Sequence, residues 1–493
     1  MKRKQLTLVI VSLLVVVLSV SLAYFTTQII GKGKDVSVTS TNLQILFTDT
    51  DGEIAGADIE PGWQKTKTFT VQNNSKSEYK YNIVIKDLLN TFVTNGYLQY
   101  KITSTNDGYN MTEFKDIPKS SAPKDTILAY SVVIPNGVTQ SYTIEFKYAN
   151  DESVDQGDDM GKKLSGTLFI TEGTEPTLLS QLLADKTTVL TRTDFSTVLT
   201  TDNTNTLYTS TEDNKTVYYF AGNAIDNWVK FGKNASNQDL YWRIIRTNSD
   251  GSVRLLYHGT SVAATDTYIE KSSFNSTYND PMYVGYMYGT SNATAMDRSN
   301  TNNSTIKTTI DNWYAQNMTS YTKYLSTTAV YCNDRSIPAG GYNIGSTRFF
   351  FGWPLRKAPT YDCEETEDRF TVDNSTGNGK LTYPIALMTA DEVLFAGGVY
   401  KINAGTWYYY NSTKGSSTGS TWWWLMTPYN WENNIAEMAR ISSSDQPGDL
   451  YANSVSLTHA VRPALSLKSC VKYSSGDGSA STPYTIKETT SGC

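Results

Sequence analysis

The sequence has little of what most hydrolytic and metal-dependent enzymes require. Its 493 residues include two histidines, His258 and His459, and neither a His-Glu-x-x-His nor a Cys-x-x-Cys motif. A zinc hydrolase or a histidine-based catalytic triad would have to use one or both of these histidines. We therefore expect no catalytic residues and no metal centre, and predict that the protein is not an enzyme.

Charge is scarce as well, and it is not basic. Lys and Arg number 42 against 48 Asp and Glu, which leaves a net charge of −6, and charged residues make up only 18% of the chain. Nucleic-acid-binding domains carry a basic excess, so we expect no nucleic-acid partner. The chain also lacks the charged segments that keep a disordered tail in solution.

Aromatic and small polar residues take the place of charge. The sequence contains 34 Tyr, 16 Phe and 10 Trp, which together are 12% of the residues. Such a composition favours β-strands and long polar loops over helices. The length exceeds what one ordinary core supports, so two or three domains are predicted.

The N-terminus has the pattern of an export segment. Lys2-Arg3-Lys4 precedes an apolar run from Leu6 to Phe25, and a basic flank before such a run directs export. About 20 residues just span a bilayer, so residues 1–34 are either a cleaved signal or an uncleaved membrane anchor. In both cases the chain from about Asp35 onward is extracellular, at the cell surface or secreted, because the basic flank stays cytoplasmic.

All four cysteines lie in the C-terminal third of the chain. Four cysteines allow three pairings, and the nearest-neighbour pairing closes two short loops, each worth roughly 3–4 kcal/mol of stability. Export supplies an oxidising environment. We therefore expect structural disulfides, with the connectivity open, among Cys332, Cys363, Cys470 and Cys493.

Residues 35–172 have the pattern of a β-sandwich. Turn-forming pairs such as Pro61-Gly62 and Asn136-Gly137 separate segments that alternate or are rich in β-branched residues. The predicted strands are Thr41–Phe47, Thr66–Gln72, Tyr79–Ile85, Gln140–Tyr148 and Leu164–Ile170.

Three segments of this region, Val36–Leu43, Ile59–Gly62 and Lys65–Asn74, resemble the TasA/camelysin family of exported Gram-positive proteins. Ala23-Tyr24-Phe25 is similar to the signal ends of that family. The resemblance covers about 25–172. It implies a jelly-roll sandwich and, for some members, assembly into biofilm-matrix fibres by strand exchange. The metalloprotease activity described for camelysin is disfavoured, because this region contains no histidine.

Two acidic clusters in the same region are candidate structural calcium ligands, since hard cations require several oxygens. Solvated acidic loops are the favoured interpretation. No other cofactor is expected. The clusters are Asp49, Asp51 and Glu53, and Asp151, Glu152, Asp155, Asp158 and Asp159.

The rest of the chain is predicted to be a linker and a second domain. Leucines at near-helical spacing from Leu178 indicate a short helix within a linker over 173–206. In the second domain, over 207–493, helices are predicted at Ser304–Trp313 and from Thr389, where Thr389-Ala-Asp-Glu392 has the form of a capping box. The remaining sequence predicts strands and long loops, giving an α+β domain.

This second domain resembles an extracellular domain family of Firmicutes that looks like a branch of the C-type-lectin / formylglycine-generating-enzyme fold. The resemblance covers about 207–486. It implies a pair between Cys332 and Cys363 and a ligand-binding domain rather than an enzyme. Calcium-dependent sugar binding is not implied, because Tyr429–Asn434 lacks the paired carboxylates. The segments that carry the resemblance are Tyr218–Asn223, Trp228–Gly232, Leu240–Arg246, Val284–Gly289, Cys332–Arg335, Leu387–Glu392, Trp424–Pro428 and Val461–Leu467.

The segment 407–461 is the predicted binding face, because it is dense in aromatic and amide side chains. Rings supply contact area at low entropic cost, while Asn and Ser supply adaptable hydrogen bonds. For Trp424, a place in the core is the favoured interpretation, and core positions are the alternative for Trp422 and Trp431. The Asn, Tyr, Ser and Asp content between Tyr429 and Tyr451, with the closing Arg462-Pro463, is also compatible with a segment diversified by a retroelement. The predicted ligand-binding residues are Trp407, Tyr409, Trp422, Tyr429, Asn430, Trp431, Asn433, Asn434 and Tyr451.

Together these features predict a mainly β protein, a jelly-roll-like β-sandwich followed by an α+β C-type-lectin-like domain with long loops. The favoured function is an exported cell-surface binding protein or adhesin that recognises a host or bacterial surface glycan or protein. An uncleaved N-terminal segment would add the membrane as a partner. A biofilm-matrix subunit that self-assembles through its sandwich is the second hypothesis. An enzyme on the formylglycine-generating type of fold is the third.

Overall fold

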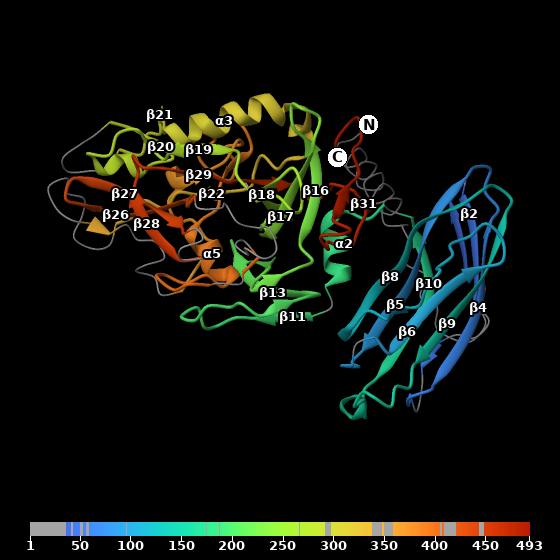
Figure 1. Cartoon of the computed structure of the whole chain (residues 1–493). Helices are drawn as coiled ribbons and strands as arrows, with labels where there is room; N and C mark the ends of the chain where they lie inside the picture. The colour runs from blue at the N-terminus through green and yellow to red at the C-terminus, as the bar shows by residue number, and fades with distance from the viewer. Residues whose placement is uncertain are drawn as a thin grey trace, which may run out of the picture. The chain divides into compact units, whose positions relative to one another are not determined.

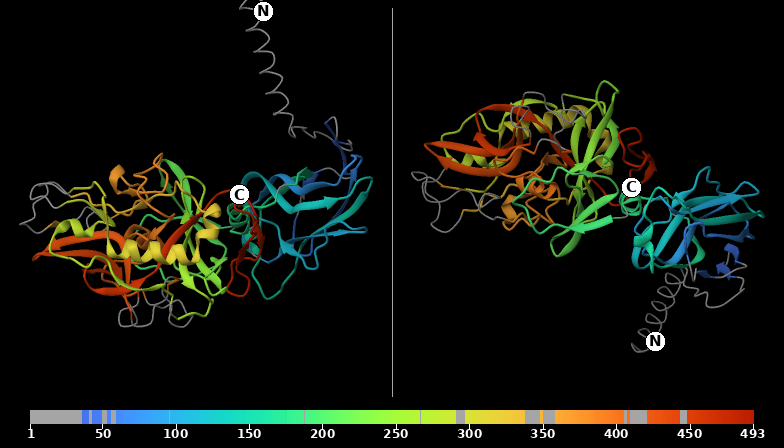
Figure 2. Two further views of the ribbon diagram at one scale, coloured as in Figure 1. Left: turned by 90° about the horizontal axis from the view of Figure 1, so that it is seen from above. Right: turned by 60° about the horizontal axis from the view of Figure 1, so that its bottom comes forward.

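The structure is a computed structural model, and its chain divides into two compact units, Met1–Pro176 and Thr177–Cys493 (Figure 1, Figure 2). Strands account for 43% and helices for 11%, so the predicted mainly β class is confirmed. Within 36–55, and at 121, 348 and 349, the backbone alone is described. The described residues are 36–40, 43–49, 53–55, 59–94, 96–173, 175–186, 188–265, 267–290, 297–337, 348–349, 358–404, 407–408, 421–442 and 448–493.

The predicted export segment, 1–34, lies outside the described residues. In the part of the chain that is described, none of the helices combines the length and the apolar composition that crossing a bilayer requires.

The first unit consists of two antiparallel sheets whose inner faces share one apolar core. One sheet has the order β1 (Val36–Ser40), β2 (Leu43–Asp49), β4 (Gln64–Asn73), β9 (Thr139–Tyr148), β6 (Leu98–Ser104) and β7 (Lys115–Asp116). The other has the order β3 (Glu53–Ala55), β10 (Leu164–Glu172), β5 (Tyr79–Asn90) and β8 (Ser120–Ile134), and a short 3₁₀ turn, η1 (Gly157–Asp159), precedes β10.

The alternation of buried and more exposed side chains along the strands explains why this pair of sheets forms. In β9 every second side chain is buried, among them Ile144 and Phe146, and these meet Ile83 of β5 and Leu168 of β10 in the core. Successive side chains of a strand point to opposite faces, so this pattern leaves one polar and one apolar face. All five predicted strands overlap observed ones, namely β2, β4, β5, β9 and β10.

Where it is described, the second unit is built on two larger sheets and three two-stranded ones. The largest contains β11 (Thr188–Thr191), β13 (Thr206–Glu212), β14 (Lys215–Tyr219), β17 (Asp239–Thr247), β16 (Trp228–Lys233), β32 (Tyr484–Ile486), β31 (Tyr473–Ser475), β18 (Val253–Gly259), β30 (Pro463–Leu467) and β25 (Ile385–Leu387). The next contains β19 (Glu270–Ser273), β29 (Thr458–Val461), β26 (Trp423–Glu432), β27 (Ile435–Ile441), β28 (Leu450–Ser454) and β23 (Arg348–Phe349). The small sheets pair β12 (Asp202–Asn203) with β15 (Asn223–Ala224), β20 (Met287–Tyr288) with β21 (Asn302–Asn303), and β22 (Tyr331–Cys332) with β24 (Arg369–Phe370).

Among the described residues of the second unit, three helices pack on these sheets, and the sequence signals locate each of these three. They are α2 (Leu178–Asp185), α3 (Thr305–Asn317) and α5 (Ala390–Ala396), and the 3₁₀ turns η2 (Pro281–Val284), η3 (Thr319–Tyr324) and η4 (Thr366–Asp368) lie between α2 and α5 in the chain. Ser304 caps α3 by accepting a hydrogen bond from the Lys307 amide, as predicted. The predicted capping box at the start of α5 is also confirmed, because Thr389 and Glu392 each accept a bond from the other's backbone N–H.

The predicted linker, 173–206, contains the expected helix, but from Thr177 onward it belongs to the second unit. Leu178 and Leu182 of α2 are buried in the core of that unit, and β11 pairs with β13 in parallel. The segment therefore connects the two units in the chain and also contributes apolar side chains to the core of the second unit.

Candidate functional site

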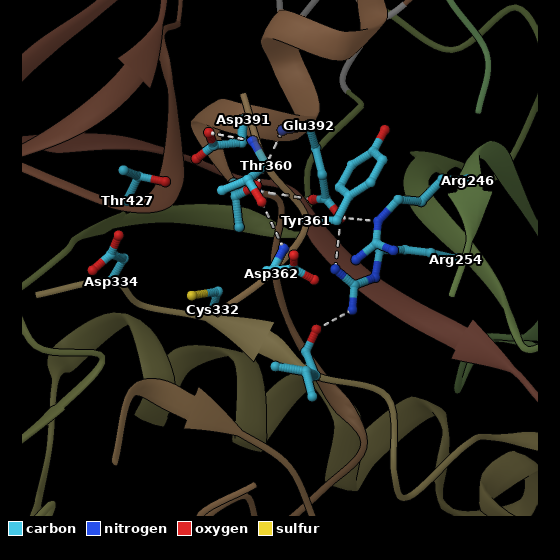
Figure 3. A pocket seen from close by; sticks show the side chains of 12 residues that line it. Arg246, Arg254, Cys332, Asp334, Thr360, Tyr361, Asp362, Asp391, Glu392 and Thr427 are labelled. Atoms are coloured by element: carbon cyan, nitrogen blue, oxygen red, sulfur yellow. Dashed lines mark hydrogen bonds and ion pairs between the residues drawn. The ribbon is translucent and has the colours of Figure 1, made fainter. Parts of the chain in front are cut away.

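A small polar pocket opens in the second unit, and charged side chains line it (Figure 3). The space it encloses is about 20 Å³, which holds about one water molecule. The lining residues are Arg246, Arg254, Val330, Cys332, Asp334, Thr360, Tyr361, Asp362, Thr389, Asp391, Glu392 and Thr427.

The floor of the pocket is a buried network of four charges centred on Glu392. Its Oε1 accepts bonds from Arg246 Nε at 2.8 Å and from Arg254 Nη1 at 2.6 Å. Arg246 also donates from Nη2 to Glu212 Oε1 at 2.8 Å. Burial alone raises the pKa of Glu392, but the charges of Arg254 and Arg246 outweigh it, so its pKa lies below the usual value.

This network is best explained by a structural role rather than by catalysis or binding. All four charged groups are compensated within it, and the space above them is too small for a substrate. Because Glu392 also completes the capping box of α5, the network attaches that helix to β17 and β18, the strands that carry the two arginines.

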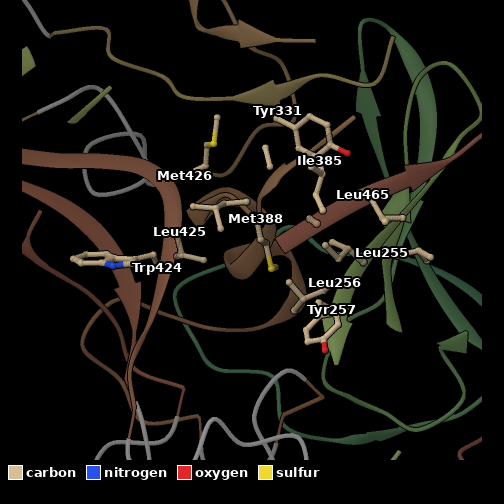
Figure 4. Packing of buried hydrophobic residues seen from close by; sticks show 14 of the residues in the cluster. Leu255, Leu256, Tyr257, Tyr331, Ile385, Met388, Trp424, Leu425, Met426 and Leu465 are labelled. Carbon is tan, nitrogen blue, oxygen red and sulfur yellow. The ribbon is translucent and has the colours of Figure 1, made fainter. Parts of the chain in front are cut away.

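Trp424 lies in the core, as the favoured interpretation of the sequence had it (Figure 4). It is fully buried together with Leu425 and Met426, and its Nε1 donates to Ser272 O at 3.0 Å. Met388 lies between these residues of β26 and Leu256 of β18, so one apolar cluster joins the two large sheets.

Four of the predicted ligand-binding residues are buried as well. Trp407 has no exposed surface, and its Nε1 donates to Ala396 O at 2.8 Å. Tyr429, Asn430 and Trp431 occupy β26 and are at most 6% exposed. Their environment is that of core and sheet residues. Tyr409 lies outside the described residues.

Asn433 and Asn434 form the turn between β26 and β27. Both are exposed, and their φ angles of 53° and 61° lie in the left-handed region. Two-residue hairpin turns of this kind favour Asn because its short side chain tolerates positive φ. The turn geometry therefore accounts for both residues without a ligand.

The remaining two predicted residues, Trp422 and Tyr451, lie half-buried on one surface of the β26–β27–β28 sheet. Three residues absent from the prediction, Tyr400, Lys401 and Arg440, join them there together with buried Tyr429. We call these six residues the aromatic face: Tyr400, Lys401, Trp422, Tyr429, Arg440 and Tyr451.

Arg440 is the centre of the aromatic face. Its guanidinium carbon lies 3.9 Å from the ring centroid of Trp422 and 5.3 Å from that of Tyr451, its cross-strand partner. A guanidinium at such distances is attracted to the ring electrons. Asp449 and Ser442 accept bonds from Nη1, which holds the buried charge in place. The two rings are therefore positioned around a fixed cation.

Tyr400 and Lys401 approach the sheet from a separate loop. The Tyr400 hydroxyl is hydrogen-bonded to that of Tyr429 at 2.7 Å, and Lys401 Nζ lies 4.5 Å from the ring centroid of Tyr451. Lys401 has a φ of 57°, and its N–H donates to Leu450 O at 3.1 Å. This bond to β28 keeps the loop in a conformation that non-glycine residues seldom adopt.

His459 supports the aromatic face from within. Its ring centroid lies 4.5 Å from that of Trp424 and 5.4 Å from that of Trp422. Nε2 is hydrogen-bonded to Asn453 Nδ2 at 3.0 Å. Burial, together with the charge of Arg440, lowers the pKa of His459 to about 4. The imidazole is therefore neutral at physiological pH.

The sequence signals for the additional residues were weak or non-local. Arg440 alternates in phase with the buried positions of β27, and only its register opposite Tyr451 shows that it lies beside an aromatic ring. Tyr400 and Lys401 lie about fifty positions before Tyr451 in the chain, so no local pattern connects them.

Both disulfides follow the nearest-neighbour pairing. Cys332 is bonded to Cys363, and Cys470 to Cys493, so no cysteine is free. The pair at Cys332 is the one that the family resemblance implied. Two disulfides fit an oxidising, extracellular environment.

The acidic clusters considered as calcium ligands are dispersed where they are described. Asp151 accepts bonds from Ser153 and from the Tyr97 hydroxyl, and Asp159 accepts from two backbone amides and Tyr148. For residues 49, 51 and 53 no side chain is described. Across the described ranges, no group of three or more His, Cys, Asp or Glu side chains is arranged to hold a metal ion.

Comparisons with protein-family models, with curated proteins and with solved structures found no match. The functional interpretation therefore depends on the geometry of the aromatic face.

Proposed function

We propose that this is an exported, cell-surface binding protein whose second unit binds a glycan at the aromatic face. The basic and apolar N-terminal sequence supports export. The two disulfides support an oxidising extracellular environment. The sandwich would then act as the stalk that carries the binding unit.

The observation that carries this proposal is the half-exposed pair of rings, Trp422 and Tyr451, fixed around buried Arg440. A sugar ring has an apolar face that stacks on an aromatic ring and hydroxyls that require polar partners. Here the rings provide the apolar contact, while exposed Lys401 and the hydroxyls of partly buried Tyr400 and Tyr451 provide the polar groups. Rigid aromatic side chains lose little entropy on binding.

The test is a glycan array probed with the chain lacking residues 1–34, followed by calorimetry on the best ligand. We expect Trp422→Ala and Tyr451→Ala each to weaken binding about tenfold or more, which corresponds to about 1.4 kcal/mol. Trp313→Ala is the matched control, because Trp313 is also a partly buried tryptophan but lies on α3. Equal losses in Trp313→Ala and Trp422→Ala, or binding to no glycan at all, would overturn the proposal.

The alternative hypothesis, a biofilm-matrix subunit that self-assembles through its sandwich, makes a different prediction for the purified protein. A chain lacking residues 1–34 would then form concentration-dependent assemblies, whereas a binding protein on a stalk would sediment as a stable monomer. Analytical ultracentrifugation over about a hundredfold range of concentration distinguishes the two hypotheses, because only the assembly of a fibre subunit depends on concentration.

A further inference from the structure

A lysine and an aspartate form an enclosed pair at the beginning of the second unit. Lys186 follows the last residue of α2, and its Nζ lies 2.7 Å from Oδ2 of Asp226, in the segment before β16. The lysine side chain has no exposed surface, and the aspartate side chain is 11% exposed.

The surroundings of the pair are aromatic. Lys186 Nζ lies 6.0 Å from the ring centroid of Phe220 and 5.6 Å from that of Tyr484. Asp226 Oδ2 also accepts a bond from the Asn205 amide at 2.7 Å, while Oδ1 is buried without a hydrogen-bond partner among the described residues. The carboxyl group is thus oriented toward the amine and is satisfied at one oxygen.

We propose that Lys186 and Asp226 are joined by an intramolecular isopeptide bond. A proton passes from the ammonium to the carboxylate, which leaves a neutral amine beside a carboxylic acid. The Nζ lone pair then attacks Cγ, the carbon–oxygen bond breaks, and that oxygen leaves as water with one proton from nitrogen. The step is a condensation, so it requires no oxidant or reductant.

Two features of the site favour this reaction. An ion pair removed from water loses its hydration, whereas the amide product carries no charge, so bond formation removes two buried charges. The site is also enclosed, which favours loss of water, since the Lys186 side chain has no exposed surface. The ring of Tyr484 faces Nζ, and its hydroxyl donates to Asp185 Oδ2 at 2.8 Å, which holds the ring there.

The bond would fasten α2 to the second unit. This helix follows the boundary between the units at Pro176, and it is otherwise held by buried Leu178 and Leu182 and by the pairing of Thr177 with Lys472. In Figure 1, α2 lies beside β31, which follows Lys472 directly. A covalent link at Lys186 would pass a pull from the N-terminal side directly to Asp226, so residues 187–225 would be shielded from that force.

The chain supplies its own control in Lys307 and Asp311. Their Nζ–Oδ2 distance is 2.6 Å and the lysine is equally buried, but both lie on α3 one helical turn apart. Lys307 Nζ has a second partner in Thr382 Oγ1 at 3.4 Å. We expect this pair to remain ionic.

The test is mass spectrometry of the reduced, denatured chain after trypsin digestion. The proposal expects peptides 164–192 and 216–230 to appear as one species, lighter than their sum by one water molecule. Cleavage after Lys186 should be absent, while cleavage after Lys307 proceeds. Separate, full-mass peptides with cleavage after Lys186 would overturn it.

Variants make the assignment specific. Lys186→Arg keeps the ion pair but should abolish the linked species. Asp226→Asn, if it condenses with Lys186, should give a species lighter by one ammonia molecule in place of water. A linked species that persists in Lys186→Arg would place the bond elsewhere and contradict the proposal.

Discussion

At the scale of single residues, the second unit buries polar groups beside its aromatic side chains. His459 packs on Trp424 and lies close to the guanidinium of Arg440, so a second positive charge there is unfavourable. His258 is buried in the same unit, and burial together with the charges of Arg243 and Arg462 lowers its pKa well below the usual value.

The first prediction is that the second unit loses stability in mild acid. An unfolded histidine has a pKa of about 6.5, while folded His459 has one of about 4. As the pH falls from 6.5 to 4, the unfolded state binds the proton first, so the free energy of unfolding decreases, by at most about 3 kcal/mol for this group. Above pH 6.5 its contribution is fully present.

Urea unfolding followed by tryptophan fluorescence checks this prediction. Of the 10 tryptophans, Trp63 alone lies in the sequence of the first unit, so the fluorescence signal reports mainly on the second unit. His459→Gln should lose part of the pH dependence, and the part due to His258 should remain. An unchanged slope between pH 6.5 and 4 in His459→Gln would contradict the assignment.

At the scale of elements, short local signals determine where helices and turns begin. The capping box at Thr389 starts α5, and the left-handed Asn433-Asn434 pair closes the hairpin of β26 and β27. In α5 the cap has a second role, because Glu392 also pairs with two arginines.

The second prediction concerns that cap. Thr389→Ala removes the oxygen that accepts from the Glu392 amide at 3.1 Å and should cost about 1 kcal/mol of unfolding free energy. Thr389→Ser keeps the oxygen and is the matched control, which we expect to unfold within a few tenths of a kcal/mol of the natural chain. Fluorescence-detected urea unfolding measures both. Equal losses in the two variants would show that the methyl group, and not the cap, is responsible.

At the scale of the whole molecule, the two units are stabilised by different means. The first relies on its sandwich core and has no cysteine in its sequence. The second has long loops and two disulfides, one of which attaches the end of the chain to Cys470.

The third prediction follows from this difference. Reduction should lower the stability of the second unit by roughly 3 kcal/mol per disulfide, because each bond restricts the unfolded chain. Scanning calorimetry with and without dithiothreitol checks this, and tryptophan fluorescence assigns the transition of the second unit. The transition of the first unit should not move. The paired variants Cys332→Ser/Cys363→Ser and Cys470→Ser/Cys493→Ser should each reproduce one part of the loss, and a shift of the first unit would contradict the prediction.

Local patterns in the sequence were enough to predict the mainly β class, five strands of the first unit and the starts of α3 and α5. It also favoured the core position of Trp424. These features depend on the alternation of apolar and polar residues, on helix caps and on apolar runs, and each of these patterns lies within a few consecutive residues.

Which aromatic residues reach the surface could not be predicted from local patterns, because it depends on contacts between distant segments. Trp407 and Trp431 look as accessible in the sequence as Trp422, yet the first two are buried beneath neighbouring segments. Arg440 and Lys401 join Tyr451 because β27 pairs with β28 and because Lys401 bonds to Leu450. Exposure and proximity depend on which strand lies opposite, and that choice is made by the packing of segments far apart in the chain.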